Sequence, residues 1–299
     1  MSGLLMLCSG QGGQHGAMFD LARTSADAAA LLDQAGVKAD PATMFDNAVA
    51  QPAIVAGALA LWEALRARLP APALVAGYSI GELAAWSVAG AIAPQDAIAV
   101  SRIRASAMDA AARSGAPQAL VACSGLPVAQ VEAVAAAHGF EAAIVNGYDA
   151  VIAGGLEADL EAFGASVAQA GGKLQRLPVT VASHTSLMAP AVNIFQAALQ
   201  GANFQTPRCA VLSGVSAVPL TTKAEAVHDL ARQLVQTIRW SDCMDAAQEA
   251  GISVALELGP GAALARMMQA RQPGIACRSV ADFRSIDGIV AWIERQLEL

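Results

Sequence analysis

The chain has 299 residues, of which 55% are hydrophobic and 14% are charged. This composition excludes intrinsic disorder, and the length allows one large domain or two smaller ones. A formal net charge of −7 without any cluster of Lys or Arg argues against nucleic-acid binding, which needs a basic surface. The mean hydropathy of +0.46 raises the question of a membrane. The longest apolar run, Ala53 to Trp62, is only about half the roughly 20 residues of a spanning helix, so we expect no membrane partner.

The N-terminal apolar stretch has no basic residue before it, which argues against a secretory signal. Five cysteines are widely spaced, and no C-x-x-C pair is present. This usage predicts reduced thiols rather than a disulfide framework or a zinc site. We therefore expect a cytoplasmic protein without a metal centre.

Short apolar runs alternate with longer helical patterns, which is typical of α/β architecture. In chain order, the first part predicts a strand at 3–8, a helix at 52–68, a strand at 73–76 and helices at 80–88 and 94–113. The middle part predicts strand 119–124, helix 127–138, strands 141–146 and 151–153, helix 156–170 and strand 173–179. The last part predicts helix 186–200, strand 209–213, helices 222–236 and 241–250, strand 253–258 and helix 285–297.

The middle part has the βαββαβ order of a ferredoxin-like unit. We therefore predict a discontinuous large α/β domain, residues 1–116 and 184–299, that is α/β-hydrolase-like with a parallel sheet. A small ferredoxin-like α+β domain, residues 117–183, interrupts it.

The strongest local signal is Gly77-Tyr78-Ser79-Ile80-Gly81, which lies between a predicted strand and a predicted helix. A G-x-S-x-G motif in this setting indicates a nucleophile elbow, a tight turn whose glycines let strand and helix approach. Ser79 is then a nucleophile, and the backbone N–H of Ile80 is placed to stabilise an oxyanion. The alternative is a purely structural turn.

A serine nucleophile needs a base, and the chain has only four histidines: His15, His138, His184 and His228. His138 and His228 lie in polar helical stretches and are expected at the surface. His184 follows an apolar segment that we predict to be a strand, just before a helix, and we favour it as the base over a structural core histidine. No nearby acidic residue completes a triad, so a backbone carbonyl is a candidate to orient the ring.

The loop Gly10-Gln11-Gly12-Gly13-Gln14 ends the first predicted strand. It has neither the lysine of a P-loop nor the spacing of a dinucleotide-binding turn. Its functional interpretation is a second oxyanion N–H from Gln11, and its structural alternative is a tight loop. On helix 94–113, Arg102 and Arg104 point in different directions, so one can face the site, where a guanidinium suits a substrate carboxylate.

Taken together, these motifs resemble those of malonyl-CoA:acyl carrier protein transacylases, in order and along essentially the whole chain. The matching segments are Gly10-Gln11-Gly12-Gly13-Gln14 (family G-Q-G-x-Q), Gly77-Tyr78-Ser79-Ile80-Gly81-Glu82 (G-H-S-x-G-E), Ile103-Arg104, Val145-Asn146 with Val151-Ile152-Ala153-Gly154, Ser183-His184 with Leu187-Met188, and Glu257-Leu258-Gly259-Pro260-Gly261.

The resemblance implies that Ser79 accepts the acyl group, His184 is its general base, Gln11 and Ile80 supply the oxyanion N–H groups, and Arg104 holds the malonyl carboxylate. It implies a ping-pong reaction in which malonyl-CoA acylates the serine. The phosphopantetheine-type thiol of an acyl carrier protein then takes the malonyl group. It implies no permanently bound cofactor, and a main-chain carbonyl that orients the histidine.

Three features depart from the family pattern. Tyr78 replaces the usual histidine beside the nucleophile, and Cys8-Ser9 replaces the usual Phe-Pro. Arg239 stands where many members have a glutamine that acts through its main-chain carbonyl. Because arginine has the same main-chain carbonyl, we expect that of Arg239 to keep this role. With the short hairpin around Tyr148, the elbow sequence looks most like the transacylase (epsilon) subunit of biotin-independent malonate decarboxylase, which loads a dedicated carrier subunit.

Three alternatives remain open at this point. A serine hydrolase would use the same Ser79 and His184, and a non-catalytic subunit would only bind a carrier. The same transfer in fatty-acid synthesis differs only in the carrier. Because Ser183 is small, methylmalonyl is a further candidate acyl group.

Overall fold

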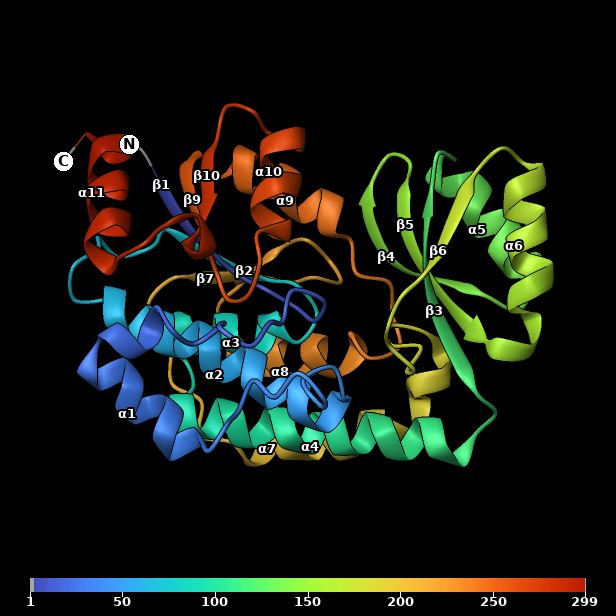
Figure 1. Ribbon diagram of the computed structural model, residues 1–299, viewed down its shortest axis with the longest axis horizontal. Helices are drawn as coiled ribbons and strands as arrows, with labels where there is room; N and C mark the ends of the chain where they lie inside the picture. Colours follow the sequence, from blue (N-terminus) through green and yellow to red (C-terminus); the bar gives the residue numbers. More distant parts are fainter. Residues whose placement is uncertain (1–2, 299) are drawn as a thin grey trace.

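The computed structural model describes residues 3–298 and contains two sheets (Figure 1). The larger sheet has the strand order β10-β9-β1-β2-β7-β8, and its neighbours are parallel except for β7 and β8. Its strands are β1 (Gly3–Cys8), β2 (Leu74–Gly77), β7 (Ala210–Leu212), β8 (Pro219–Leu220), β9 (Ile252–Leu258) and β10 (Ala276–Ser279). The predicted parallel sheet of an α/β fold is therefore confirmed.

Helices cover both faces of this sheet, as the alternation along β1 requires. Leu4, Met6 and Cys8 belong to one apolar cluster, and Leu5 and Leu7 belong to the opposite one. The first cluster is completed by α1 (Ala26–Ala35), α2 (Asn47–Leu65), α3 (Gly81–Val88), α4 (Pro94–Ser114), α7 (Ala189–Gly201), α8 (Lys223–Arg232) and α11 (Ile286–Leu297). The second is completed by α9 (Trp240–Glu249) and α10 (Ala263–Arg271).

The smaller sheet lies at one end of the molecule and is antiparallel, with the order β4-β5-β3-β6 (Figure 1). It comprises β3 (Gln118–Ser124), β4 (Glu141–Gly147), β5 (Ala150–Leu156) and β6 (Lys173–Arg176), with α5 (Val128–Ala137) and α6 (Leu160–Gln169). This order is that of the ferredoxin-like unit predicted from sequence. The exact domain boundaries at 116/117 and 183/184 stay a prediction.

Backbone hydrogen bonds tie the small sheet to the segment that precedes α9, near the site. The N–H of Val145 in β4 donates to the carbonyl of Ile238 at 2.8 Å, and the N–H of Ile238 donates to the carbonyl of Ala143 at 2.9 Å. These bonds hold the end of β4 against the segment that precedes α9.

Several predicted bounds were wrong. Helix α2 begins at Asn47 rather than at Pro52, so the proline lies inside the helix instead of in its first turn. The strand predicted at 173–179 ends at Arg176, and the segment up to His184 is loop rather than strand. The prediction missed α1, α10, β8 and β10.

Helix α2 is long and apolar enough to cross a membrane by length and composition alone. Most of its residues are buried inside the fold, against α1, α3 and α4. Its apolar character is therefore explained by its place in the core.

Candidate active site

Ser79 lies on the turn between β2 and α3, with a φ of 54°. A side chain at Gly77 would place its Cβ 2.2 Å from the nitrogen of Glu82, and one at Gly81 would place it 2.2 Å from the carbonyl oxygen of Cys8. Only glycine fits at these two positions, because the obstacles are backbone atoms. The sharp strand–turn–helix expected of a nucleophile elbow is therefore present.

Ser79 and His184 form a hydrogen-bonded pair although 105 residues separate them. Ser79 Oγ lies 2.8 Å from His184 Nε2, and His184 Nδ1 lies 2.5 Å from the main-chain carbonyl oxygen of Gln233. A carbonyl oxygen only accepts, so Nδ1 carries the ring proton and Nε2 is left as the acceptor for the serine hydroxyl. This is the arrangement in which the imidazole can take a proton from Ser79.

The imidazole is held in its neutral form. His184 is almost completely buried, and its backbone has a positive φ of 65°. Burial, together with the positive charge of Arg104, lowers the pKa of His184 to about 3. At neutral pH the ring is therefore a free base.

The expected role of the Arg239 carbonyl was wrong. That oxygen accepts from the N–H of Cys243 at 3.0 Å, and the exposed guanidinium pairs with Asp242 at 2.7 Å. The carbonyl that orients His184 belongs to Gln233 instead. Because every residue type has a main-chain carbonyl, no residue pattern marks the position of the one that orients His184.

Arg104 is the arginine of α4 that faces inward, and Arg102 is exposed. Its Nη1 donates to Gln51 Oε1 at 2.8 Å, and its Nη2 donates to Gln233 Oε1 at 3.3 Å. Both acceptors are neutral, and within residues 3–298 no carboxylate oxygen lies within 4.0 Å of this guanidinium. Burial lowers the pKa of Arg104 to about 10, so it stays charged at neutral pH. The site therefore holds a buried cation with no directly bound anion.

Gln233 connects the two halves of this site. Its main-chain oxygen accepts from His184, and its side-chain oxygen accepts from Arg104. Its side-chain nitrogen donates to Glu82 Oε2 at 2.5 Å. The sequence prediction assigned no role to Gln51, Glu82 or Gln233: Glu82 stood in the elbow motif without a function, and no motif marked the two glutamines.

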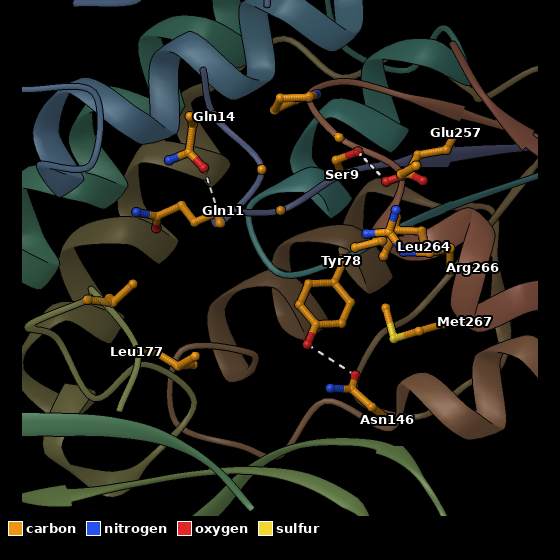
Figure 2. A pocket seen from close by; sticks show the side chains of 18 of the residues that line it. Ser9, Gln11, Gln14, Tyr78, Asn146, Leu177, Glu257, Leu264, Arg266 and Met267 are labelled. Atoms are coloured by element: carbon orange, nitrogen blue, oxygen red, sulfur yellow. Dashed lines mark hydrogen bonds between the residues drawn. The ribbon is translucent and has the colours of Figure 1, made fainter. Parts of the chain in front are cut away.

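The loop Gly10–Gln14 packs against the elbow and lines a cavity of about 390 Å³ (Figure 2). A side chain on Gly10 would lie 2.7 Å from the carbonyl oxygen of Tyr78, so loop and elbow are in direct contact. Within residues 3–298 neither the backbone N–H of Gln11 nor that of Ile80 makes a hydrogen bond. Neither donor is therefore engaged by another described residue.

The cavity lies between the carboxyl ends of the large-sheet strands and the small sheet, where ligands bind in open α/β folds. Tyr78 Oη donates to Asn146 Oδ1 of β4 at 3.1 Å across this boundary, and its ring meets Trp240 edge-on at a centroid distance of 5.3 Å. Met267 and Arg266 of α10 line another wall. His184 lines a second hollow, of about 520 Å³.

The cavity wall is braced by a buried carboxylate that the sequence showed only as part of a motif. Glu257 at the end of β9 accepts from Ser9 Oγ at 2.8 Å and from the N–H of Ala265 at 2.8 Å. It thus joins β1, β9 and the start of α10. Ser9, which departs from the family pattern, has a structural partner here (Figure 2).

The other candidate groups lie elsewhere. His138 bonds to Ser166 at 2.8 Å in the small domain, His228 pairs with Asp229 at 2.8 Å, and His15 is exposed. All five cysteines are free thiols. Among the described residues, no group of three or more His, Cys, Asp or Glu side chains is placed to hold a metal ion.

The fold and this serine–histidine site define an enzyme that transfers acyl groups. Comparison with protein-family profiles matches residues 5–285 to the acyl transferase domain, and the chain belongs to this family. The malonyl-CoA:acyl carrier protein transacylase of Mycobacterium bovis is 30% identical over 298 residues, with 95% of this chain and 98% of the relative covered. That of Salmonella typhimurium is 34% identical over 223 residues, covering 72% and 71%.

Solved structures agree with this assignment. The malonyl-CoA:acyl carrier protein transacylase of Xanthomonas oryzae superposes with a TM-score of 0.91 at 29% identity, over 98% of each chain. A malonyl-transacylase solved in complex with the acyl carrier protein of a type II polyketide synthase superposes with a TM-score of 0.90 at 25% identity, over 97% of this chain and 99% of that one.

Proposed function

We propose that this acyltransferase moves a malonyl group from malonyl-CoA to the prosthetic-group thiol of an acyl carrier protein, with Ser79 as the nucleophile. The observation that carries the proposal is the continuous series of hydrogen bonds from Ser79 through His184 and Gln233 to Arg104, a buried cation without an ion-pair partner among the described residues. Relatives named as malonyl transacylases along nearly the whole chain support the choice of acyl group.

In the first half-reaction, Ser79 Oγ attacks the thioester carbonyl while its proton passes to His184 Nε2. The negative oxygen of the tetrahedral intermediate accepts from the N–H groups of Gln11 and Ile80. The carbon–sulfur bond then breaks, and the CoA sulfur takes the proton from Nε2. The products are a malonyl ester of Ser79 and free CoA thiol.

In the second half-reaction, the carrier thiol gives its proton to His184 Nε2, and its sulfur attacks the ester carbonyl. The same two N–H groups stabilise the second intermediate. The ester bond breaks, and Ser79 Oγ recovers the proton from Nε2. The enzyme returns to its starting state, so the reaction is of the ping-pong type and needs no resident cofactor.

Arg104 is the proposed partner of the malonyl carboxylate. Gln51 and Gln233 fix its guanidinium from two sides through neutral oxygens, which leaves the positive charge for the substrate. A buried charge is costly until an opposite charge meets it, so an acyl group with a carboxylate is favoured over one without. The small Ser183 beside the base leaves methylmalonyl as a second acyl group to test.

The acceptor thiol belongs to one of two kinds of carrier protein. The elbow sequence and the short hairpin around Tyr148 favour the carrier subunit of malonate decarboxylase, and a cytoplasmic location goes with this role. The carrier of fatty-acid synthesis fits the same chemistry equally well.

The test is intact-mass analysis of the protein after it is mixed with malonyl-CoA, with and without each carrier. We expect a malonyl adduct that persists in water and is discharged by one carrier, together with release of one CoA per enzyme. The Ser79→Ala variant should fold and form no adduct. An adduct that water removes as fast as it forms would favour a hydrolase, and an unchanged mass in the wild type would favour a non-catalytic carrier-binding subunit.

A further inference from the structure

Glu82 is a buried carboxyl group that the proposed chemistry does not use. It is the second residue of α3, three positions after Ser79, and it has no exposed surface. Its Oε2 accepts from the N–H of Gly214 at 3.0 Å and from Gln233 Nε2 at 2.5 Å. Its Oε1 has no hydrogen-bond partner within the described part of the chain.

The bond to Glu82 determines which end of the Gln233 amide faces Arg104. An amide group has a donor end and an acceptor end, whereas a guanidinium only donates. Because the nitrogen of Gln233 is engaged by Glu82 Oε2, its oxygen is turned toward Arg104 Nη2. The reversed amide would point its N–H groups at the guanidinium and push it away.

The same logic holds on the other side of the guanidinium. Gln51 Oε1 accepts from Arg104 Nη1, and Gln51 Nε2 donates to Asn47 Oδ1 at 2.6 Å. Arg104 is thus held between the side-chain oxygens of Gln51 and Gln233. The amide nitrogen of each glutamine donates to a further oxygen, Asn47 Oδ1 or Glu82 Oε2, and this bond orients the amide. Of these two acceptors, only Glu82 is ionisable.

The geometry also indicates the charge state of Glu82. An ionised carboxylate would leave part of its charge on an unpartnered, fully buried Oε1, which costs far more than a neutral hydroxyl at that position. Burial raises the pKa of Glu82 to about 8, which agrees with a protonated group at neutral pH. A neutral Glu82 does not compete with a substrate carboxylate for the charge of Arg104.

We propose that Glu82 is the positioning residue of the carboxylate-binding arginine: acting through Gln233, it presents an amide oxygen to Arg104 and, as a neutral acid, leaves the guanidinium charge to the substrate. This inference rests on the proposed malonyl transfer. Glu82 touches neither the acyl group nor the reacting atoms, and its effect on the reaction passes through Gln233.

Loss of the proton from Glu82 places a second negative charge near the malonyl carboxylate. The charged or titratable groups that face Glu82 are Arg104 on α4, Asp229 on α8, Cys243 on α9 and, through Gln233, His184. Hydrogen bonds lower the pKa of Asp229, and the pKa of His184 is about 3, so both have lost their titrating protons at pH 7. The pKa of Arg104 is about 10 and burial raises that of Cys243, so both keep their protons. Between pH 7 and 9, Glu82 is therefore the group of this set that changes charge.

The experiment compares single-turnover acylation by malonyl-CoA and by acetyl-CoA, followed by intact mass at pH 7 and pH 9. The acyl-CoA concentration is varied to separate the maximal rate from the half-saturating concentration. For the wild type we expect the half-saturating concentration of malonyl-CoA to rise about fivefold at the higher pH, because like charges repel in a buried site. That of acetyl-CoA should stay constant.

Two variants separate the roles of the oxygen and of the charge. Glu82→Gln keeps an acceptor oxygen and the volume but cannot ionise, so it should match the wild type at pH 7 and show no rise at pH 9. Glu82→Met removes the acceptor, and it should raise the half-saturating concentration of malonyl-CoA about tenfold while acetyl-CoA changes less than twofold. Ser87→Ala, on the same helix and outside this network, is the matched control.

Two results would overturn the inference. One is an equal loss of malonyl and acetyl transfer in Glu82→Met, which would make Glu82 merely structural. The other is an unchanged pH response in Glu82→Gln, and this variant alone decides the question if Glu82→Met does not fold. Arg104→Ala, measured in parallel, distinguishes failure of this inference from failure of the proposed function. If this variant loses malonyl and acetyl transfer equally, the proposed function is wrong, whatever the result for Glu82.

Discussion

Replacement of Arg104 by alanine tests which acyl group the enzyme is built to hold. In the wild type Arg104 is 2% exposed, and its guanidinium is bonded to two neutral amide oxygens. A charge-assisted bond to the malonyl carboxylate contributes about 1.5–3 kcal/mol, and removing one partner costs more because the other charge stays buried alone. A loss of about 3 kcal/mol corresponds to roughly 10²-fold.

We therefore expect Arg104→Ala to lower kcat/KM for malonyl-CoA by about 10²-fold or more. Acetyl-CoA has no carboxylate, so its transfer should be kept or should increase in the variant. The assay is the rate of CoA release with each substrate, measured on both proteins. Thermal unfolding checks that the variant, which also loses the contact of Arg104 with the Phe195 ring, remains folded.

Arg102→Ala is the matched control, because Arg102 is exposed on the same helix and contacts the carbonyl of Ala35 instead of the site. It should leave the preference for malonyl-CoA unchanged. Equal losses of malonyl and acetyl transfer in Arg104→Ala would show that Arg104 is structural, and the case for a dicarboxylic acyl group would lose its main physical support.

Three further outcomes are expected. His184→Ala should slow acylation of Ser79 by about 10²–10⁴-fold, and a wild-type rate in stopped-flow assays would show that His184 is not the base. Because burial lowers the pKa of His184 to about 3, the imidazole stays unprotonated as the pH falls. The rate at which acetyl-CoA acylates Ser79 should therefore be constant from pH 7.5 to 5.5. A decrease in this rate centred near pH 6.5 would contradict the expectation. Tyr78→Phe removes the 3.1 Å bond to Asn146 and should lower the free energy of unfolding by about 1 kcal/mol, whereas Tyr148→Phe, at an exposed hairpin tip, should not change it.

The parts of the site that were predictable from sequence are those made by neighbouring residues. The elbow around Ser79 needs two glycines within five positions, because strand and helix approach there, and this requirement is visible in the sequence. The predicted pairing of Ser79 with His184 is present in the structure, since few histidines were available to serve as the base. The inward choice of Arg104 over Arg102 followed only from the resemblance.

The parts that could not be predicted depend on contacts between distant segments. Arg104 is 53 residues from Gln51 and 129 residues from Gln233, and only the tertiary fold brings α4, α2 and the end of α8 together at this point. The carbonyl that orients His184 was assigned to Arg239 and belongs to Gln233, because any residue type can supply a main-chain oxygen. Glu82 was recognisable in the sequence as part of the elbow motif. Its complete burial, with hydrogen bonds to only one of its two carboxyl oxygens, follows from tertiary structure.

The close approach of α3 to β1 gives the last prediction, on Gly81→Ala. The added Cβ would lie 2.2 Å from the carbonyl oxygen of Cys8 and 2.6 Å from that of Ser9, and neither backbone atom can move without shifting β1. We expect a loss of about 3 kcal/mol in the free energy of unfolding, together with a displaced Ser79. Because the nucleophile itself moves, malonyl and acetyl transfer should fall together, unlike in Arg104→Ala.

Gly201→Ala is the control for this substitution, because Gly201 ends α7 and a Cβ there meets nothing within 4 Å. It should be neutral or should stabilise the protein by up to about 1 kcal/mol, since alanine loses less backbone entropy on folding. Urea unfolding and single-turnover acylation measure both effects on each variant. A Gly81→Ala protein with wild-type stability and wild-type acylation would show that the elbow does not need this contact, and that Ser79 is held in place by its pairing with His184 alone.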